Sequence, residues 1–169
     1  MTMRNEELAD VFDEIADMLE LRDDNFYHQR AYRVAAESLR DYPTSLAELP
    51  RDQLRDQLKK IRGIGPNLAA HLATLLETGE LPLLTELREK YPRSLLELKN
   101  IPGLGTNRIK ILAELMNIRS REDLKHAVET GSIAKLRGFG PKLQERLRNL
   151  LAVEPAAPKE AVQRRPIRN

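Results

Sequence analysis

The chain has 169 residues, of which 41% are hydrophobic, 4% aromatic and 32% charged, and its formal net charge is +2. It contains no cysteine, which excludes disulfides, thiol nucleophiles and cysteine-ligated zinc. It has no run of 18 apolar residues, and its first residues are acidic, unlike a membrane span or a signal peptide. We therefore expect a soluble, cytoplasmic protein with a core of Leu, Ile, Val and Ala, a composition that favours helices.

Charge is distributed unevenly along the chain. Residues 1–24 contain nine acidic residues against Arg4 and Arg22, a net charge of −7 that leaves +9 on the remaining residues. A basic body beside an acidic helix suits a polyanionic ligand, and ordinary solvated helix faces explain the same charges equally well.

Apolar residues recur at helical spacing through most of the chain. Helices are predicted at 5–21, 26–40, 51–60, 66–77, 82–90, 106–116, 121–129 and 141–151, with short helical pieces within 41–50 and at 94–99. Gly79 has the position of a left-handed helix cap, and Ser120 that of an N-cap. No segment alternates like a strand, so the predicted fold is all-α. We expect two small helical subdomains at 1–80 and 81–152, and a disordered basic tail at 153–169.

One glycine pattern occurs three times. It reads apolar–X–Gly–apolar–Gly at residues 61–65, 101–105 and 136–140, each time between a short helix and a longer one. Spacings of 40 and 35 residues between the copies indicate a repeated structural unit. Glycine permits a tight reversal, and the central residue (Ile64, Leu104 or Phe139) can plug the space between the flanking helices.

The helix that follows each turn presents free N–H groups and a partial positive charge, which suit a phosphate oxygen. A backbone without side chains lets DNA approach closely, and such contacts carry no base information. The predicted DNA-backbone residues are Gly63, Gly65, Asn67, Gly103, Gly105, Thr106, Asn107, Arg108, Lys110, Gly138, Gly140 and Lys142. We expect valine at Gly65 and Gly103 together to abolish binding while the helices survive.

Other glycine motifs do not fit. A dinucleotide-binding loop would need a third glycine where Leu68, Arg108 and Leu143 stand, and a strand before it. A P-loop would need Gly-Lys-Ser/Thr. A plain tight connection between helices explains any single copy, and three copies make it a poor explanation of the set.

The pattern resembles the helix-hairpin-helix motif of DNA-binding proteins. The ordered segments LADVFDEIADMLEL, RAYRVAAESL, IRGIGPNLA, LETGELPLL, IPGLG and LRGFGPKLQERL resemble the N-terminal region of family X DNA polymerases, over residues 5–152. The resemblance implies a lyase-like domain with the first hairpin, followed by a fingers-like domain with the other two. It also implies a monovalent cation, Na⁺ or K⁺, at the backbone carbonyls of Lys59, Ile61 and Ile64 and of Lys99, Ile101 and Leu104.

The resemblance also bears on activity. The polymerase active site lies in a palm domain for which the chain has no residues. The family's lyase lysine corresponds to His71, whose imidazole cannot form the required iminium. A 5′-phosphate pocket of His28, Tyr32, Lys59 and Lys60 is implied, with His28 where lyase-active members have lysine. His28, His71 and His126 have no second ligand at the spacing of a metal site. With the lyase lysine replaced, the resemblance implies weak or no lyase activity, with Lys59 or Lys60 as inefficient substitutes, and we assign no catalytic residue.

The predicted function is sequence-independent binding of the DNA backbone in repair of nicked, gapped or damaged DNA. The predicted protein is a cytoplasmic, nucleoid-associated monomer with no cofactor beyond Na⁺ or K⁺, no membrane contact, and DNA and a repair protein as candidate partners. Three alternatives stay open: an abasic-site or 5′-deoxyribose-phosphate lyase, which borohydride trapping would reveal; a protein-interaction module; and a fragment of a polymerase.

Overall fold

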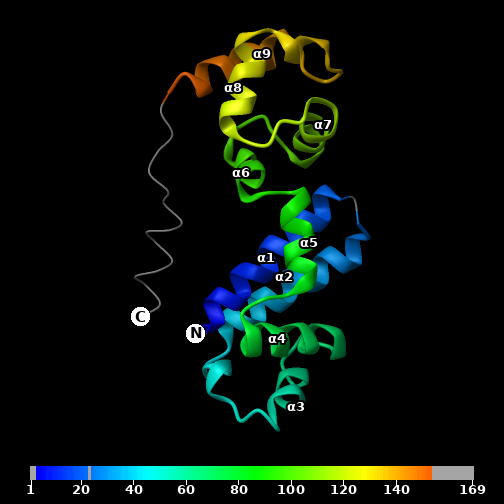
Figure 1. Ribbon diagram of the computed structural model, residues 1–169, viewed down its shortest axis with the longest axis vertical. Coiled ribbons are helices and arrows are strands. Elements are labelled where there is room, and N and C mark those ends of the chain that lie inside the picture. The colour runs from blue at the N-terminus through cyan, green and yellow to red at the C-terminus, as the bar shows by residue number, and fades with distance from the viewer. Residues whose placement is uncertain (1–2, 23, 154–169) are drawn as a thin grey trace. The chain divides into compact units, whose positions relative to one another are not determined.

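The computed structural model describes residues 3–22 and 24–153. Within them every regular element is a helix, which confirms the predicted all-α fold (Figure 1). The chain forms two compact units, which meet in sequence between Tyr91 and Pro92.

The first unit is built on two long helices that pair antiparallel. Its elements are α1 (Asn5–Leu21), α2 (Phe26–Asp41), the 3₁₀ turn η1 (Leu46–Glu48), α3 (Leu54–Lys59), α4 (Pro66–Thr78) and α5 (Pro82–Lys90). Leu8, Phe12 and Ile15 of α1 are fully buried, as are Ala35 and Leu39 of α2. Burial of these apolar surfaces is the main stabilising contribution to the pair.

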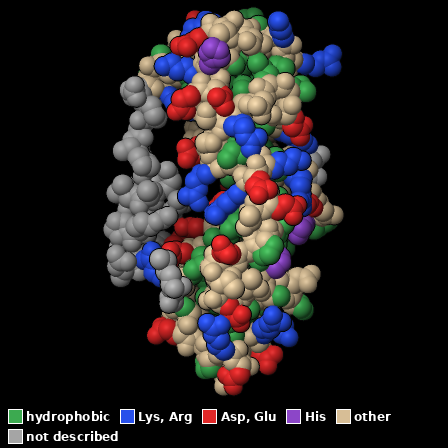
Figure 2. Space-filling view, in the orientation of Figure 1, with side chains coloured by type: hydrophobic (Ala, Val, Ile, Leu, Met, Phe, Trp, Pro, Cys, Tyr) green, Lys and Arg blue, Asp and Glu red, His purple; other side chains and the backbone are tan. Residues whose placement is uncertain are grey.

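The acidic side chains of α1 form ion pairs with two arginines of α2. Arg40 of α2 forms ion pairs with Glu6, Asp10 and Asp13 at 2.7–2.8 Å. Arg33, two turns earlier on α2, contacts Asp17 and Glu20 at 2.9 and 3.0 Å. The acidic segment that stands out in the sequence is therefore largely neutralised inside the first unit. Figure 2 accordingly shows acidic and basic side chains interspersed on the visible face.

Helix α5 belongs to the first unit, where the sequence predicts a boundary at 80/81. The guanidinium of Arg88 donates to both carboxylate oxygens of Glu14 at 2.6 and 2.8 Å, and Glu14 is only 9% exposed. Proximity to this carboxylate raises the pKa of Arg88. A buried carboxylate requires such a partner, so this contact ties α5 to α1 within the compact unit that ends at Tyr91.

The second unit contains shorter helices around a small apolar core. Its elements are α6 (Arg93–Leu96), the 3₁₀ turn η2 (Glu97–Asn100), α7 (Thr106–Met116), α8 (Arg121–Glu129), the 3₁₀ turn η3 (Ser132–Lys135) and α9 (Pro141–Leu151). Ser120 caps α8 as predicted, accepting from the Asp123 amide at 3.1 Å. Arg121 donates to the carbonyls of Leu150 and Val153 at the end of α9. The predicted tail at 153–169 lies, apart from Val153, outside the described residues.

Candidate nucleic-acid interface

Three hairpin turns of one design connect α3 to α4, η2 to α7 and η3 to α9. In each turn the central apolar residue, Ile64, Leu104 or Phe139, is buried, which confirms its predicted role as a plug. Its N–H donates to the carbonyl three residues earlier, at 3.0 Å in the first two turns and 3.3 Å in the third. This bond and the buried plug fix the turn.

The two glycines of each turn have different backbone conformations. The first glycine of each pair is left-handed, with φ of +84° at Gly63, +96° at Gly103 and +90° at Gly138. The second is the N-cap of the next helix in extended conformation, for example φ −88° and ψ −172° at Gly65. Only the first position therefore needs glycine for its backbone, and the second is a glycine for another reason.

The second glycines lie at open helix N-termini. At Gly65, Gly105 and Gly140 an added Cβ would meet no atom within 4 Å, and all three residues are exposed. None of these N-caps has a side-chain acceptor for the first amides of its helix. Each turn thus leaves helix N–H groups on an open surface that a phosphate can reach.

The first glycines of the first two turns pack against neighbouring elements. A Cβ on Gly63 would lie 2.7 Å from Cγ1 of Val34, and one on Gly103 would lie 3.0 Å from Cδ1 of Leu143. We expected valine at Gly103 to leave the helices intact. The structure argues against this expectation, because a side chain at Gly103 would adopt φ of +96° and press against Leu143. The second glycines are the positions that test binding without disturbing the fold.

The residue two places after each second glycine is polar and exposed: Asn67 in α4, Asn107 in α7 and Lys142 in α9. Thr106 and Lys110 are half-buried on α7. Sequence reasoning missed Arg62 and Arg137, which are exposed directly before the first glycine of their turns. Both arginines occupy position X of the repeat, so comparing the copies could have identified them. In the second copy this position is Pro102.

Arg108 has a different role from the other predicted contacts. Its Nη1 donates to the carbonyl of Gly103 at 3.0 Å, and its Nε donates to the carbonyl of Gly138 at 3.3 Å. The guanidinium therefore joins the second and third turns. Arg108 is better placed to hold these two turns at a fixed spacing than to contact a ligand itself.

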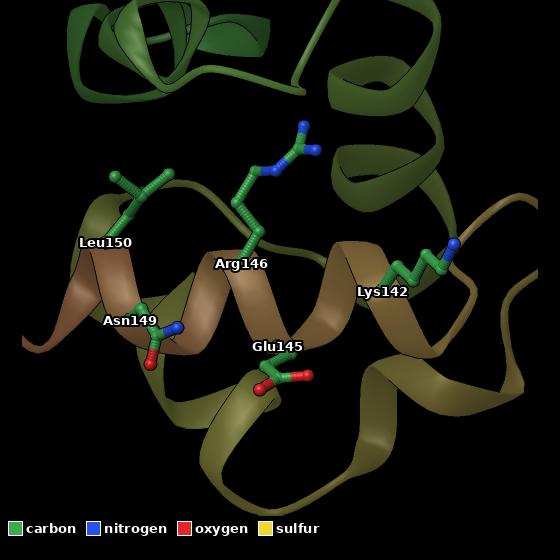
Figure 3. Close-up of a pocket in the computed structure, with 5 residues that line it drawn as sticks. All are labelled: Lys142, Glu145, Arg146, Asn149 and Leu150. Atoms are coloured by element: carbon green, nitrogen blue, oxygen red, sulfur yellow. The ribbon is translucent and has the colours of Figure 1, made fainter.

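A shallow cavity of about 360 Å³ lies along α9, lined by Lys142, Glu145, Arg146, Asn149 and Leu150. Figure 3 shows Lys142, Arg146 and Leu150 projecting from the same side of this helix. The guanidinium of Arg146 would lie 3.6 Å from a Cβ on Gly103, so this basic side chain is close to the second turn.

The residues of the predicted 5′-phosphate pocket are only partly brought together. Tyr32 is 1% exposed, and its hydroxyl lies 3.0 Å from Nδ1 of His71. His28 lies against the Tyr32 ring and contacts Asp24 at 3.2 Å, and hydrogen bonds from Arg22 and His28 lower the pKa of Asp24 to about 2. Lys59 and Lys60 are both exposed, and Lys59 pairs with Asp56 at 3.8 Å. The observed cluster is thus His28, Tyr32 and His71.

The Tyr32–His71 contact predicts a pH dependence. Burial raises the pKa of Tyr32 to about 12, so its hydroxyl stays protonated where it lies 3.0 Å from Nδ1 of His71. Burial, and then the nearby His28, lower the pKa of His71 below 6.5. The unfolded chain therefore binds the proton more readily, and stability should fall as the pH drops below 6.5. Histidine NMR titration should give His71 a pKa under 6.5, and a higher value would contradict the partial burial of this ring beside His28.

Two of the six carbonyls for which the resemblance implies a monovalent cation belong to the hydrogen bonds that close the turns. The carbonyls of Ile61 and Ile101 accept hydrogen bonds from the N–H groups of Ile64 and Leu104 at 3.0 Å, and each keeps a second lone pair.

Across residues 3–22 and 24–153 no group of three His, Cys, Asp or Glu residues could hold a metal ion. None of the described helices is long and apolar enough to cross a bilayer.

Comparison with known proteins agrees with this geometry. Residues 3–81 match the family described as "Helix-hairpin-helix domain", and residues 95–151 match "SAM-like Helix-hairpin-helix tandem". The chain carries two helix-hairpin-helix regions. The second contains the two turns that Arg108 joins. Helix-hairpin-helix motifs are DNA-binding elements, so both regions indicate DNA binding.

A similar protein is the "DNA polymerase/3'-5' exonuclease PolX" of Bacillus subtilis (strain 168). It is 29% identical over 145 residues, which are 86% of this chain and 24% of the Bacillus protein. The predicted resemblance to family X DNA polymerases is thereby confirmed, and the chain spans about a quarter of that relative's length.

Proposed function

We propose that the chain holds DNA by its sugar-phosphate backbone, independently of sequence, at the three hairpin turns. The observation that carries this proposal is the open surface around Gly65, Gly105 and Gly140, each at a helix N-terminus without a side-chain cap. Oriented amides and the helix dipole attract phosphate there, and a missing Cβ lets the DNA backbone approach.

The polar residues at the second helical position extend each site. Asn67, Asn107 and Lys142 are exposed one residue after the first residue of α4, α7 and α9. Their side chains can donate to phosphate oxygens beside the turn amides. We place a Na⁺ or K⁺ ion at the turn carbonyls, where it would add positive charge near the same phosphate.

The DNA would be nicked, gapped or damaged, as expected of a protein that acts in repair, and the chain would act as a monomer. Support comes from the polymerase and exonuclease named in the similar Bacillus protein. The role proposed for this chain is holding the substrate. His71 stands where the resemblance expects the lyase lysine, and its ring nitrogen is engaged by Tyr32 at 3.0 Å, which favours binding over lyase chemistry.

The test places aspartate at the second glycine of a hairpin. Aspartate is a preferred N-cap and suits the helix dipole, so Gly65→Asp should leave α4 at least as stable as before. The carboxylate would occupy the turn amides and repel phosphate. Affinity for duplex DNA should fall about tenfold for each hairpin changed, as expected for losing a charge-assisted hydrogen bond.

The matched control is Ser120→Asp, which adds the same charge at the N-cap of α8, outside the hairpins. It should bind DNA almost like the unchanged protein. For every phosphate that a hairpin variant no longer neutralises, the slope of log affinity against log salt should also become shallower by about 0.9 on duplex DNA. Equal affinity of Gly65→Asp, Gly105→Asp and Gly140→Asp proteins with the unchanged chain would refute binding at the turns.

A further inference from the structure

The second and third hairpin turns are joined by reciprocal contacts between their helices. The third residue of α7 is Arg108, and its Nε donates to the carbonyl of Gly138, the first glycine of the third turn, at 3.3 Å. The third residue of α9 is Leu143, and its Cδ1 would lie 3.0 Å from a Cβ on Gly103, the first glycine of the second turn. Equivalent residues of two copies of the repeat thus each reach the first glycine of the other copy.

The two contacts differ in how closely they fix the turns. Leu143 supplies apolar packing, which is non-directional. Arg108 supplies two directed hydrogen bonds from one planar guanidinium, because its Nη1 also donates to the carbonyl of Gly103 at 3.0 Å. A rigid group that donates to both first glycines holds the two turns at one separation. The first turn has no such arginine, since the equivalent residue of α4 is Leu68, which is 8% exposed.

The bridging guanidinium and the open helix N-termini have separate places in these turns. Arg108 is half-buried, and two of its nitrogens already donate to carbonyls. The second glycines, Gly105 and Gly140, are exposed and have open space around them. Phosphates would therefore bind beside Gly105 and Gly140, and Arg108 would set the distance between them.

We propose that Arg108 is a positioning residue that makes the second and third turns bind two DNA phosphates as one unit. This inference rests on the proposed function, because it requires that each turn binds a phosphate. When two sites are held at a fixed separation, the second phosphate binds intramolecularly, at a high effective concentration. Without the bridge the separation varies, so part of this gain is lost although each turn keeps its own amides.

The first test replaces Arg108 by lysine, which keeps the charge and does not reproduce the planar fork. We expect Arg108→Lys to lower the affinity of the full chain for duplex DNA about tenfold. In a protein that already carries Gly140→Asp the third turn is disabled, so the same lysine should have almost no further effect. A lysine that disturbed the second unit as a whole would instead weaken binding in both proteins, and that result would overturn the proposal.

The salt dependence of binding tests whether Arg108 contacts DNA directly. Losing the charge of a residue that neutralises a phosphate makes the slope of log affinity against log salt shallower by about 0.9. Arg108→Gln should weaken binding as much as Arg108→Lys, and both proteins should have the same slope. A slope shallower by about 0.9 in the glutamine protein alone would show that Arg108 is a phosphate ligand and not a positioning residue.

The matched control is Arg148→Gln, which removes the same charge from an exposed side chain on the face of α9 opposite Arg146. It should bind DNA almost like the unchanged protein.

Gly140→Asp separates this proposal from the hairpin function. If Gly140→Asp weakens binding, and Arg108→Lys has the same effect with and without it or no effect in either protein, the coupling is wrong and the hairpin function stands. If Gly140→Asp itself leaves binding unchanged, phosphate binding at the third turn fails, and the coupling fails with it.

Discussion

Replacing Arg88 by alanine should destabilise the first unit by about 3 kcal/mol, the range found when one partner of a buried ion pair is removed. The two hydrogen bonds of 2.6 and 2.8 Å join α5 to a carboxylate on α1 that is only 9% exposed. Without the guanidinium, the charge of Glu14 would lie in a site with little water to solvate it. Arg88 itself is partly exposed, which keeps the expected loss toward the lower end of that range.

The first unit carries its own spectroscopic probe. All four tyrosines of the chain lie in residues 1–91, so tyrosine fluorescence during urea denaturation reports unfolding of that unit. Adding Glu14→Gln to Arg88→Ala should recover part of the loss, because an amide is less costly to bury than a charge. The control is Arg51→Ala, whose partner Glu77 lies 3.5 Å away on an open surface. That variant should change stability by less than about 0.5 kcal/mol. A similar small change for Arg88→Ala would show that α5 is not anchored through Glu14.

The sequence was sufficient for most of the helices, because their signals are local. Apolar periodicity, the C-cap at Gly79 and the N-cap at Ser120 predict α4 and α8 within one residue of the structure. The repeat likewise predicts the three turns, since a glycine pair around a buried apolar residue leaves few other conformations. Helix η3 was missed because its four residues are too short to show a period.

Contacts between distant residues could not be predicted in the same way. Arg30 and Arg33 look equivalent in sequence, yet Arg33 forms ion pairs with Asp17 and Glu20 of α1, whereas Arg30 is exposed and forms no ion pair with the described residues. Arg108 looks like a phosphate ligand beside Lys110, and its partners are carbonyls of two turns 35 residues apart. The contact between α5 and α1 likewise depends on the pairing of Arg88 with Glu14, 74 residues away.

The two glycines of a hairpin should differ sharply when substituted, with the largest effect at Gly63. Alanine at Gly63 would adopt φ of +84° and place its Cβ 2.7 Å from Cγ1 of Val34. A left-handed conformation costs an ordinary residue about 1–2 kcal/mol, and forced overpacking adds about 1–3 kcal/mol. We expect Gly63→Ala to lower the free energy of unfolding of the first unit by about 3 kcal/mol, measured by tyrosine fluorescence.

The control lies in the same unit. Gly79 ends α4 with φ of +76°, and a Cβ there would meet no atom within 4 Å. Gly79→Ala should therefore show only the conformational cost, about 1 kcal/mol. Val34→Ala removes the clashing methyl groups, so the Val34→Ala/Gly63→Ala protein should be more stable than the sum of the single changes predicts. Equal losses for Gly63→Ala and Gly79→Ala would show that the approach to Val34 is not tight. Gly65→Asp should weaken DNA binding without this loss of stability. Comparing Gly63→Ala with Gly65→Asp would therefore show that the first glycine of the turn is needed for folding and the second for phosphate binding.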